Sequence, residues 1–264
     1  MKIWSVANQK GGVGKTTTAV SLAGLCVLHG AKVLLIDMDP HGSLTSYFGY
    51  DPETIQPSLY DVFQAEKMNQ AFTQSLIRPT TLNNLNLLPA STAIATLDKQ
   101  LGAKSGMGLA VVNALKHIEH EYDHVFIDCP PMLGVLMVNA LAACDQLVIP
   151  VQTEFLAMKG LDRMLNTLDM IERAKSIHIN YTIVPTMFDK RTRASLESLQ
   201  YLRDNYGDHL WTGVIPIDTR FRESSKEGKP ISHYRVSTRG ARAYSSLLDL
   251  LLQGKDTNKQ VAVI

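Results

Sequence analysis

The sequence predicts an α/β fold with a doubly wound, mostly parallel sheet that carries helices on both faces. Short runs rich in Val, Ile and Leu alternate along the chain with longer amphipathic segments. Near-continuous apolar strands are typical of parallel sheets, because helices bury both of their faces. The expected strands are residues 3–7, 33–36, 85–88, 125–127, 147–151, 181–184 and 214–215.

Helical patterns fill most of the gaps between these strands. The first helix is expected from about Lys15 to His29, and Gly30 follows it in a position that favours a helix C-terminus. The other expected helices are residues 106–120, 134–143, 158–174, 194–205 and 238–252. No linker or repeat interrupts this alternation, so we expect one domain over residues 1–253 and a flexible tail over 254–264.

The composition is that of a globular protein with a large core. Of the 264 residues, 45% are hydrophobic and 19% are charged. Lys and Arg total 26 against 25 Asp and Glu, so the net charge gives no argument for nucleic acid or a membrane. A mild basic excess between residues 185 and 242 fits either phosphate contacts or a solvated surface.

The cysteines and the apolar runs indicate the compartment. Cys26, Cys129 and Cys144 lie in apolar surroundings without paired spacing, which favours buried thiols over disulfides or a metal site. No signal-peptide pattern opens the chain, and no apolar run approaches the roughly 18 residues that span a bilayer. We therefore expect a soluble, cytoplasmic protein with no membrane insertion.

A glycine-rich segment after the first strand carries the strongest chemical signal. Its residues are Lys10, Gly11, Gly12, Val13, Gly14, Lys15, Thr16 and Thr17. The glycines let backbone N–H groups turn toward phosphate oxygens, and the following helix offers its positive end. Lys15 is expected to reach the β- and γ-phosphates, and the Thr16 hydroxyl to bind Mg²⁺. The order of strand, loop, Gly-Lys-Thr and helix predicts a P-loop nucleotide site in which Gly11–Thr17 cradle the phosphates.

One departure from the common P-loop pattern narrows this prediction. Where that pattern has glycine, the chain has Gln9, and Lys10 follows it. The segment resembles the deviant Walker A motif, KGGxGKT[ST], of the ParA/MinD family of ATPases. The resemblance implies that Lys10 reaches across a dimer interface to the partner's nucleotide and couples ATP binding to homodimer formation.

Carboxylates end two of the expected strands. Asp37 and Asp39 follow the second strand, and Asp128 ends the strand that begins near residue 125. A carboxylate at such a strand end can hold Mg²⁺ through water. The family resemblance assigns Asp39 to the attacking water and to Mg²⁺, and makes Asp37 a structural carboxylate. We thus expect Lys10, Lys15 and Asp39 to be catalytic, and Thr16, Asp39 and Asp128 to hold the metal.

The resemblance extends over nearly the whole chain. Residues 150–161, 185–192 and 215–232 look like ParA-type segments, and the resemblance implies that Met187 and Pro216 lie near adenine. ATP and Mg²⁺ are therefore the expected cofactors. The leucines between 247 and 252 fit a final core helix better than the basic membrane helix of MinD-like proteins. Nitrogenase iron protein shares the loop, but the cysteines here are not placed to hold its cluster.

Two interpretations of the cargo follow, both with a slow, partner-stimulated ATPase whose output is a conformational and oligomeric state. In DNA partitioning, the ATP dimer binds nonspecific DNA and a ParB-like partner triggers hydrolysis. The resemblance then implies DNA contacts by Arg191, Arg193, Arg220 and Arg222.

In the second interpretation the cargo is a protein complex. The stretch DPHGSLTSYFGYDP over residues 39–52 departs from the DPQGN usual in chromosomal ParA proteins. It is similar to the ParC group, which places chemotaxis arrays at cell poles through an adaptor protein. We favour this interpretation, which predicts polar placement, because the departure adjoins Asp39. Nucleoid association and nonspecific DNA binding are compatible with both.

A third interpretation is metabolic. Dethiobiotin synthetase and related P-loop ligases share the fold and couple ATP to small-molecule chemistry. The sequence has no separate substrate-binding constellation to support it, and its segments near Asp39 and Asp128 match the positioning ATPases better.

Overall fold

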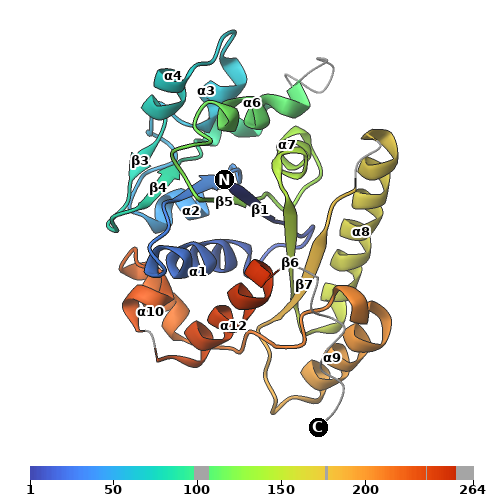
Figure 1. Ribbon diagram of the computed structural model, residues 1–264. Coiled ribbons are helices and arrows are strands. Elements are labelled where there is room, and N and C mark those ends of the chain that lie inside the picture. Colours follow the sequence, from blue (N-terminus) through green and yellow to red (C-terminus); the bar gives the residue numbers. More distant parts are fainter. Residues whose placement is uncertain (98–106, 176–177, 236, 254–264) are drawn as a thin grey trace.

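A computed structural model describes residues 1–97, 107–175, 178–235 and 237–253. The described residues form a seven-stranded sheet in the order β3-β4-β2-β5-β1-β6-β7 (Figure 1). All neighbouring strands pair in parallel except β3, which runs antiparallel to β4. The strands are β1 (Lys2–Val6), β2 (Val33–Asp37), β3 (Arg78–Pro79), β4 (Leu85–Leu88), β5 (His124–Asp128), β6 (Gln146–Gln152) and β7 (Tyr181–Thr186).

Helices cover both faces of this sheet, as the sequence predicts. The α-helices are α1 (Lys15–Leu28), α2 (Ser43–Tyr47), α3 (Leu59–Gln64), α4 (Gln70–Ser75), α6 (Ala110–Lys116), α7 (Val135–Ala143), α8 (Phe155–Lys175), α9 (Arg193–Tyr206), α10 (Arg220–Lys226), α11 (Ile231–Tyr234) and α12 (Arg239–Gln253). Short 3₁₀ turns occur at Thr92–Thr96, Met107–Leu109 and Gly207–His209.

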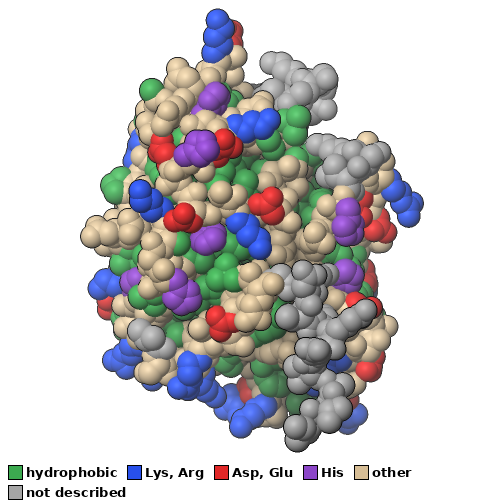
Figure 2. Space-filling view, viewed as in Figure 1, with side chains coloured by type: hydrophobic (Ala, Val, Ile, Leu, Met, Phe, Trp, Pro, Cys, Tyr) green, Lys and Arg blue, Asp and Glu red, His purple; other side chains and the backbone are tan. Residues whose placement is uncertain are grey.

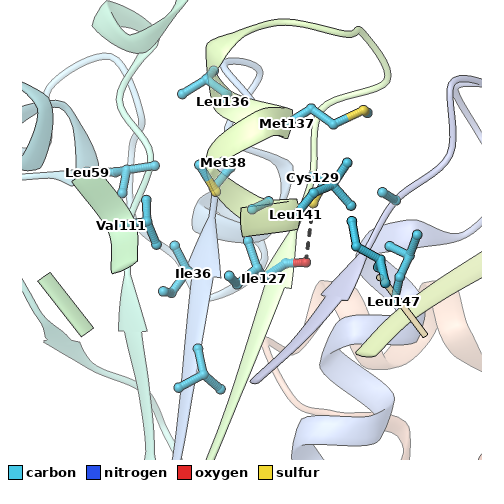
Figure 3. Packing of buried hydrophobic residues seen from close by; sticks show 14 of the residues in the cluster. Ile36, Met38, Leu59, Val111, Ile127, Cys129, Leu136, Met137, Leu141 and Leu147 are labelled. Carbon is cyan, nitrogen blue, oxygen red and sulfur yellow. Dashed lines mark hydrogen bonds between the residues drawn. The ribbon is translucent and has the colours of Figure 1, made fainter. Parts of the chain in front are cut away.

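The alternation of side chains along the strands divides the core into two layers. In β5, Val125 and Ile127 join the cluster beneath α6, α7 and α8, whereas Phe126 joins the cluster beneath α1 and α12. Successive strand side chains point to opposite faces, so a strand buried on both sides is apolar throughout. Figure 3 shows Ile36 of β2 beside Val111 of α6, within the first of these two clusters.

Helix α1 fixes the segment that follows β1. It ends as expected: Gly30 takes a left-handed φ of 87°, and its N–H donates to the Val27 carbonyl. In its middle, a Cβ on Gly24 would lie 2.3 Å from the Cβ of Pro230, so α1 and α11 pack at a distance that only glycine allows.

Some expected elements differ from the structure. The strand at 214–215 is wrong: beyond β7 the described chain makes two isolated bridges, Ile183 with Leu210 and Phe188 with Pro216, and a proline cannot donate to a ladder. The helix expected over 106–120 covers only Ala110–Lys116, and residue 106 lies outside the described residues, as does the tail 254–264.

The thiols and the last helix follow the sequence expectations in most respects. Cys26 and Cys129 are buried, Cys144 is half-buried, and all three are free. In α12, Leu247, Leu248 and Leu251 are buried, while Leu250 and Leu252 are exposed. Over the ranges that the structure describes, no helix has the length and apolar character to cross a bilayer.

Candidate functional site

The glycine-rich segment leaves β1 at the centre of the sheet, between β5 and β6 (Figure 1). Gly12 and Gly14 take left-handed φ values of 76° and 91°, which favour glycine. Gly14 is the N-cap of α1, and within the described chain no side chain caps the helix there. The first N–H groups of α1 are therefore available to an anion, which the helix dipole also favours.

Lys15 begins α1 and is buried, with a relative exposure of 8%. Its ammonium donates to the Lys10 carbonyl at 3.2 Å. A buried ammonium on the rim of a phosphate-sized loop supplies the positive charge that a polyphosphate requires.

Thr16 and Asp128 meet directly. The Thr16 hydroxyl donates to Oδ2 of Asp128 at 2.6 Å. The other oxygen, Oδ1, is buried and has no hydrogen-bond partner within the described residues. Oxygen donors with an unsatisfied carboxylate oxygen fit Mg²⁺, a hard cation that binds one or two protein carboxylates and retains water.

Asp37 lies beside Asp128, because β2 and β5 pair with these two residues in register. Burial raises the pKa of Asp37 to about 6, although the Thr45 hydroxyl and two backbone N–H groups donate to its carboxylate. Burial and then the neighbouring Asp37 raise the pKa of Asp128 well above its ordinary value, and Thr16 and Lys15 offset only part of this. Positive charge placed next to these two buried carboxyl groups would thus stabilise their ionised forms.

Asp39 lies at the rim of the same site. Its side chain is 16% exposed, and its charge contributes to the raised pKa of Asp128. Oδ1 accepts from the His41 backbone N–H at 3.0 Å and lies 2.8 Å from the His41 ring Nδ1. The structure therefore brings Asp39 near Asp128, without a direct hydrogen bond between them.

Helix α8 and the residue just before it hold the two residues that set this loop apart from a common P-loop. The Gln9 amide donates to the Thr167 hydroxyl at 2.6 Å, and the Lys10 ammonium forms an ion pair with Glu154. A Cβ on Gly160 would lie 2.9 Å from the Cβ of Lys10, so α8 leaves room for this lysine. Sequence reasoning found Lys10 but missed Glu154 and Gly160, since they lie about one hundred and fifty residues away along the chain.

A cavity of about 500 Å³ adjoins the glycine-rich loop. Met187 and Pro216 line it together with Gly14 and Thr17, so the structure brings these four predicted residues to one cavity. The remaining lining residues are Gln152, Thr186, Ile215, Ile217, Asp218, Thr219, Phe221, Arg222 and Tyr244. Of these, Arg222 is a predicted DNA contact. The others except Tyr244 lie in the family-like segments 150–161, 185–192 and 215–232, but the sequence predicts no role for them.

The four predicted DNA-contacting arginines lie in two regions. Arg191 lies in the turn just before α9 and Arg193 begins that helix, whereas Arg220 and Arg222 lie in α10. The first three form ion pairs, with Asp189, Glu197 and Asp218 respectively. Arg222 instead lines the cavity beside the loop.

The start of α12 interacts with the acidic partners of Arg191 and Arg220. The guanidinium of Arg191 lowers the pKa of Asp189 to about 2, with a smaller contribution from Arg239. The backbone N–H of the next residue, Gly240, donates to Asp218. Figure 2 shows Lys and Arg side chains gathered along the lower edge of the molecule, over the region of α10 and α12.

The comparisons with known proteins agree with this geometry. A family model described as an AAA domain (AAA_31) matches residues 1–181. The sporulation initiation inhibitor protein Soj of Bacillus subtilis is 36% identical over 251 residues, which cover 93% of this chain and 96% of Soj. The chromosome partitioning protein ParA of Myxococcus xanthus is 33% identical and covers 98% of this chain and 90% of its own. The chain belongs to the ParA family of P-loop ATPases.

A solved structure shares the fold of this ParA-family chain. Cobyrinic acid a,c-diamide synthase from Mycobacterium smegmatis, with bound ATP analog and magnesium, superimposes with a TM-score of 0.81 at 31% identity. The match covers 96% of this chain and 95% of that one. The likeness includes the doubly wound sheet that carries the glycine-rich loop, which confirms the predicted fold class.

Proposed function

We propose that this ParA-family protein binds ATP with Mg²⁺ in the glycine-rich loop, dimerises in that state, and partitions DNA through a ParB-like partner that stimulates hydrolysis. The observation that carries the nucleotide site is the contact of Thr16 with Asp128 beside an uncapped, glycine-rich helix N-terminus. The M. smegmatis relative, solved with an ATP analog and magnesium, supports the same cofactors here.

Each residue of the nucleotide site has a chemical role in this proposal. Lys15 neutralises the β- and γ-phosphates, and Gly11–Thr17 donate backbone N–H groups to them. Thr16 and Asp128 hold Mg²⁺, which supplies charge compensation to the triphosphate when it is bound. Asp39 orients the attacking water and assists at the metal. Met187 and Pro216 enclose the adenine in the adjoining cavity.

The homodimer is supported by Lys10 and by apolar side chains at the same edge. Met132 and Leu133 follow β5, Phe155 and Leu156 follow β6, and all four are exposed. The two strands flank β1, so these side chains lie on either side of the glycine-rich loop. Exposed apolar side chains around a polar site are typical of a protein interface. Lys10 lies among them and would leave Glu154 to reach the partner's nucleotide.

DNA as the cargo is supported by the names of the relatives and by the exposed arginines. Soj and ParA match nearly the whole chain, and ParA carries chromosome partitioning in its name. Exposed ion pairs such as that of Arg191 contribute little free energy, so these arginines can exchange an acidic partner for a DNA phosphate. The protein would then associate with the nucleoid.

The chemotaxis-array alternative is supported by residues 39–52, whose departure from DPQGN adjoins Asp39. In this alternative an adaptor protein takes the place of the ParB-like partner, and the ATPase is placed at a cell pole. Because the relatives with near-complete coverage include chromosome partitioning proteins, we place DNA partitioning first.

A titration of DNA distinguishes these cargoes. The full chain with a non-hydrolysable ATP analogue and Mg²⁺ is expected to bind nonspecific duplex DNA with a log–log salt slope of about −0.9 per phosphate contacted. Arg191→Ala and Arg220→Ala should each make the slope shallower by about one for every copy of the side chain in contact. Lys116→Ala, an exposed basic residue at the end of α6, serves as the matched control.

The outcomes separate the proposals. Binding that requires ATP and weakens with salt supports DNA partitioning. A nucleotide-loaded protein that binds no DNA at low salt would refute it and favour the adaptor-bound protein cargo. Turnover stimulated by a small carboxylic acid, and by neither DNA nor a protein partner, would favour the metabolic ligase.

A further inference from the structure

His41 has an unexplained position beside Asp39. Its side chain is 82% exposed, yet its ring Nδ1 lies 2.8 Å from Oδ1 of Asp39. Within the described part of the chain the ring has no other hydrogen-bond partner, so packing does not account for its orientation. The residue also occupies the position where the DPQGN pattern has glutamine.

The backbone around His41 is fixed by other residues. The Asp37 carboxylate accepts from the Asp39 N–H at 3.1 Å and from the Thr45 N–H at 2.7 Å. The Gly42 N–H donates to the Asp39 carbonyl at 2.8 Å, and Gly42 takes a left-handed φ of 61°. A Cβ on Gly42 would lie 2.4 Å from the Cβ of Pro52, so the turn is packed from outside as well. Loss of the imidazole should therefore leave the turn in place.

The two oxygens of Asp39 have different environments. Oδ1 accepts from both donors of His41, its backbone N–H and its ring. Among the described residues, Oδ2 has no hydrogen-bond donor. A carboxylate held by one oxygen keeps its side-chain rotamer and presents the other oxygen in a defined direction.

We propose that His41 is a positioning residue for Asp39: its ring Nδ1–H holds Oδ1, so that Oδ2 faces the water that attacks the γ-phosphate. This inference rests on the proposed ATPase function and assigns a further residue to the same site. His41 itself does not touch the reacting atoms. His41 keeps the Asp39 carboxylate aligned. Without this hydrogen bond, the carboxylate at the rim of the site would be mobile.

Substitution of His41 tests the proposal through steady-state hydrolysis of ATP by the full chain. His41→Ala is expected to lower kcat about three- to tenfold, the worth of a hydrogen bond of about 1 kcal/mol, with KM for ATP unchanged. His41→Asn should restore at least half of the wild-type kcat, because its amide nitrogen is bonded to Cγ, as Nδ1 is in histidine. His120→Ala, an exposed histidine paired with Glu119, is the matched control and should behave as wild type.

Three results are decisive. A kcat of His41→Ala equal to wild type overturns the proposal. An equal loss in His41→Asn and His41→Ala also overturns it, because Asn retains a donor at this position and Ala does not. A wild-type protein that neither binds nor hydrolyses ATP refutes the proposed function instead, before any variant is compared.

Discussion

Asp37 and Asp128 place two carboxyl groups side by side in the interior of the protein. Burial disfavours both negative charges, and the pKa of each is raised. Positive charge at the strand ends removes this penalty, and Lys15 already lowers the pKa of Asp128 in part. A cation would be most favourable at Oδ1 of Asp128, which has no hydrogen-bond partner in the part of the chain that the structure describes.

The hydroxyl of Thr16 should be essential for metal-dependent nucleotide binding. Thr16→Ala removes the donor to Asp128 and one of the oxygen ligands proposed for Mg²⁺. Hydrogen bonds to charged groups contribute about 1.5–3 kcal/mol, so we expect the affinity for ATP with Mg²⁺ to fall at least about tenfold. Isothermal titration calorimetry with ATP, in the presence and absence of Mg²⁺, measures this.

Thr16→Ser is the control for this prediction, because it retains the hydroxyl and should bind within a few-fold of wild type. Without Mg²⁺ the two variants should bind ATP equally. A Thr16→Ala protein that binds ATP with Mg²⁺ as wild type does would contradict the metal assignment.

At the residue scale, local motifs were predictable and long-range partners were not. Lys15 and Thr16 follow directly from the glycine-rich segment, and Asp128 from its place at a strand end. Glu154 carries no local signal, because an acidic residue before a helix is ordinary. Its meaning comes from the fold, which brings α8 next to the loop after β1 and sets Glu154 against Lys10.

Helix α8 acts as the support for the loop that begins at Gln9. Thr167 holds Gln9, Glu154 holds Lys10, and Gly160 provides space for the lysine side chain. A movement of Gln9 or Lys10 toward a partner subunit would therefore have to break these contacts. Helix α8 also carries the exposed Phe155 and Leu156 at its start, so the same element supports the lysine and contributes to the proposed dimer face.

Release of Lys10 from Glu154 should favour the dimer. Glu154→Gln removes an ion pair whose partners are 26% and 40% exposed, and such pairs contribute about 0.2–1 kcal/mol. Two pairs are broken in each dimer, so we expect the dimer dissociation constant with ATP to fall roughly two- to thirtyfold. Sedimentation velocity across protein concentrations measures the change.

Glu197→Gln removes an exposed ion pair with Arg193 on α9 and is the matched control. It should leave the dimer dissociation constant unchanged. A weaker dimer in Glu154→Gln would indicate that Glu154 contributes to the interface itself and does not compete for Lys10.

At the scale of elements, the sequence predicts the long helices and the uniformly apolar strands. Strands β2 and β5 were predictable because helices bury both of their faces. The short helices α2, α3 and α4 were missed, since they have only five or six residues each. Side-chain caps support α3 and α4, such as the pairing of Ser58 with Asp61, whereas α2 has no side-chain cap. The wrong strand at 214–215 is an apolar pair that follows β7 without joining the sheet ladder.

The whole molecule combines these parts at one edge of the sheet. The glycine-rich loop, Asp39, Asp128 and the exposed apolar side chains all follow the carboxyl ends of β1, β2, β5 and β6. In doubly wound folds this edge binds ligands, and here it would also meet a second copy of the chain. In the proposed function, a nucleotide bound at this edge would therefore control both turnover and assembly.

In the proposed function ATP, and not ADP, assembles this chain into a dimer through Lys10. Sedimentation velocity of Asp39→Ala, in which hydrolysis should be blocked, measures this assembly. With ATP and Mg²⁺ we expect the mass to double, with ADP it should remain that of one chain, and Lys10→Ala in the same background should bind ATP and stay monomeric. A nucleotide-loaded Asp39→Ala protein that remains monomeric, or a dimer that forms equally well without Lys10, would refute ATP-dependent dimerisation through Lys10.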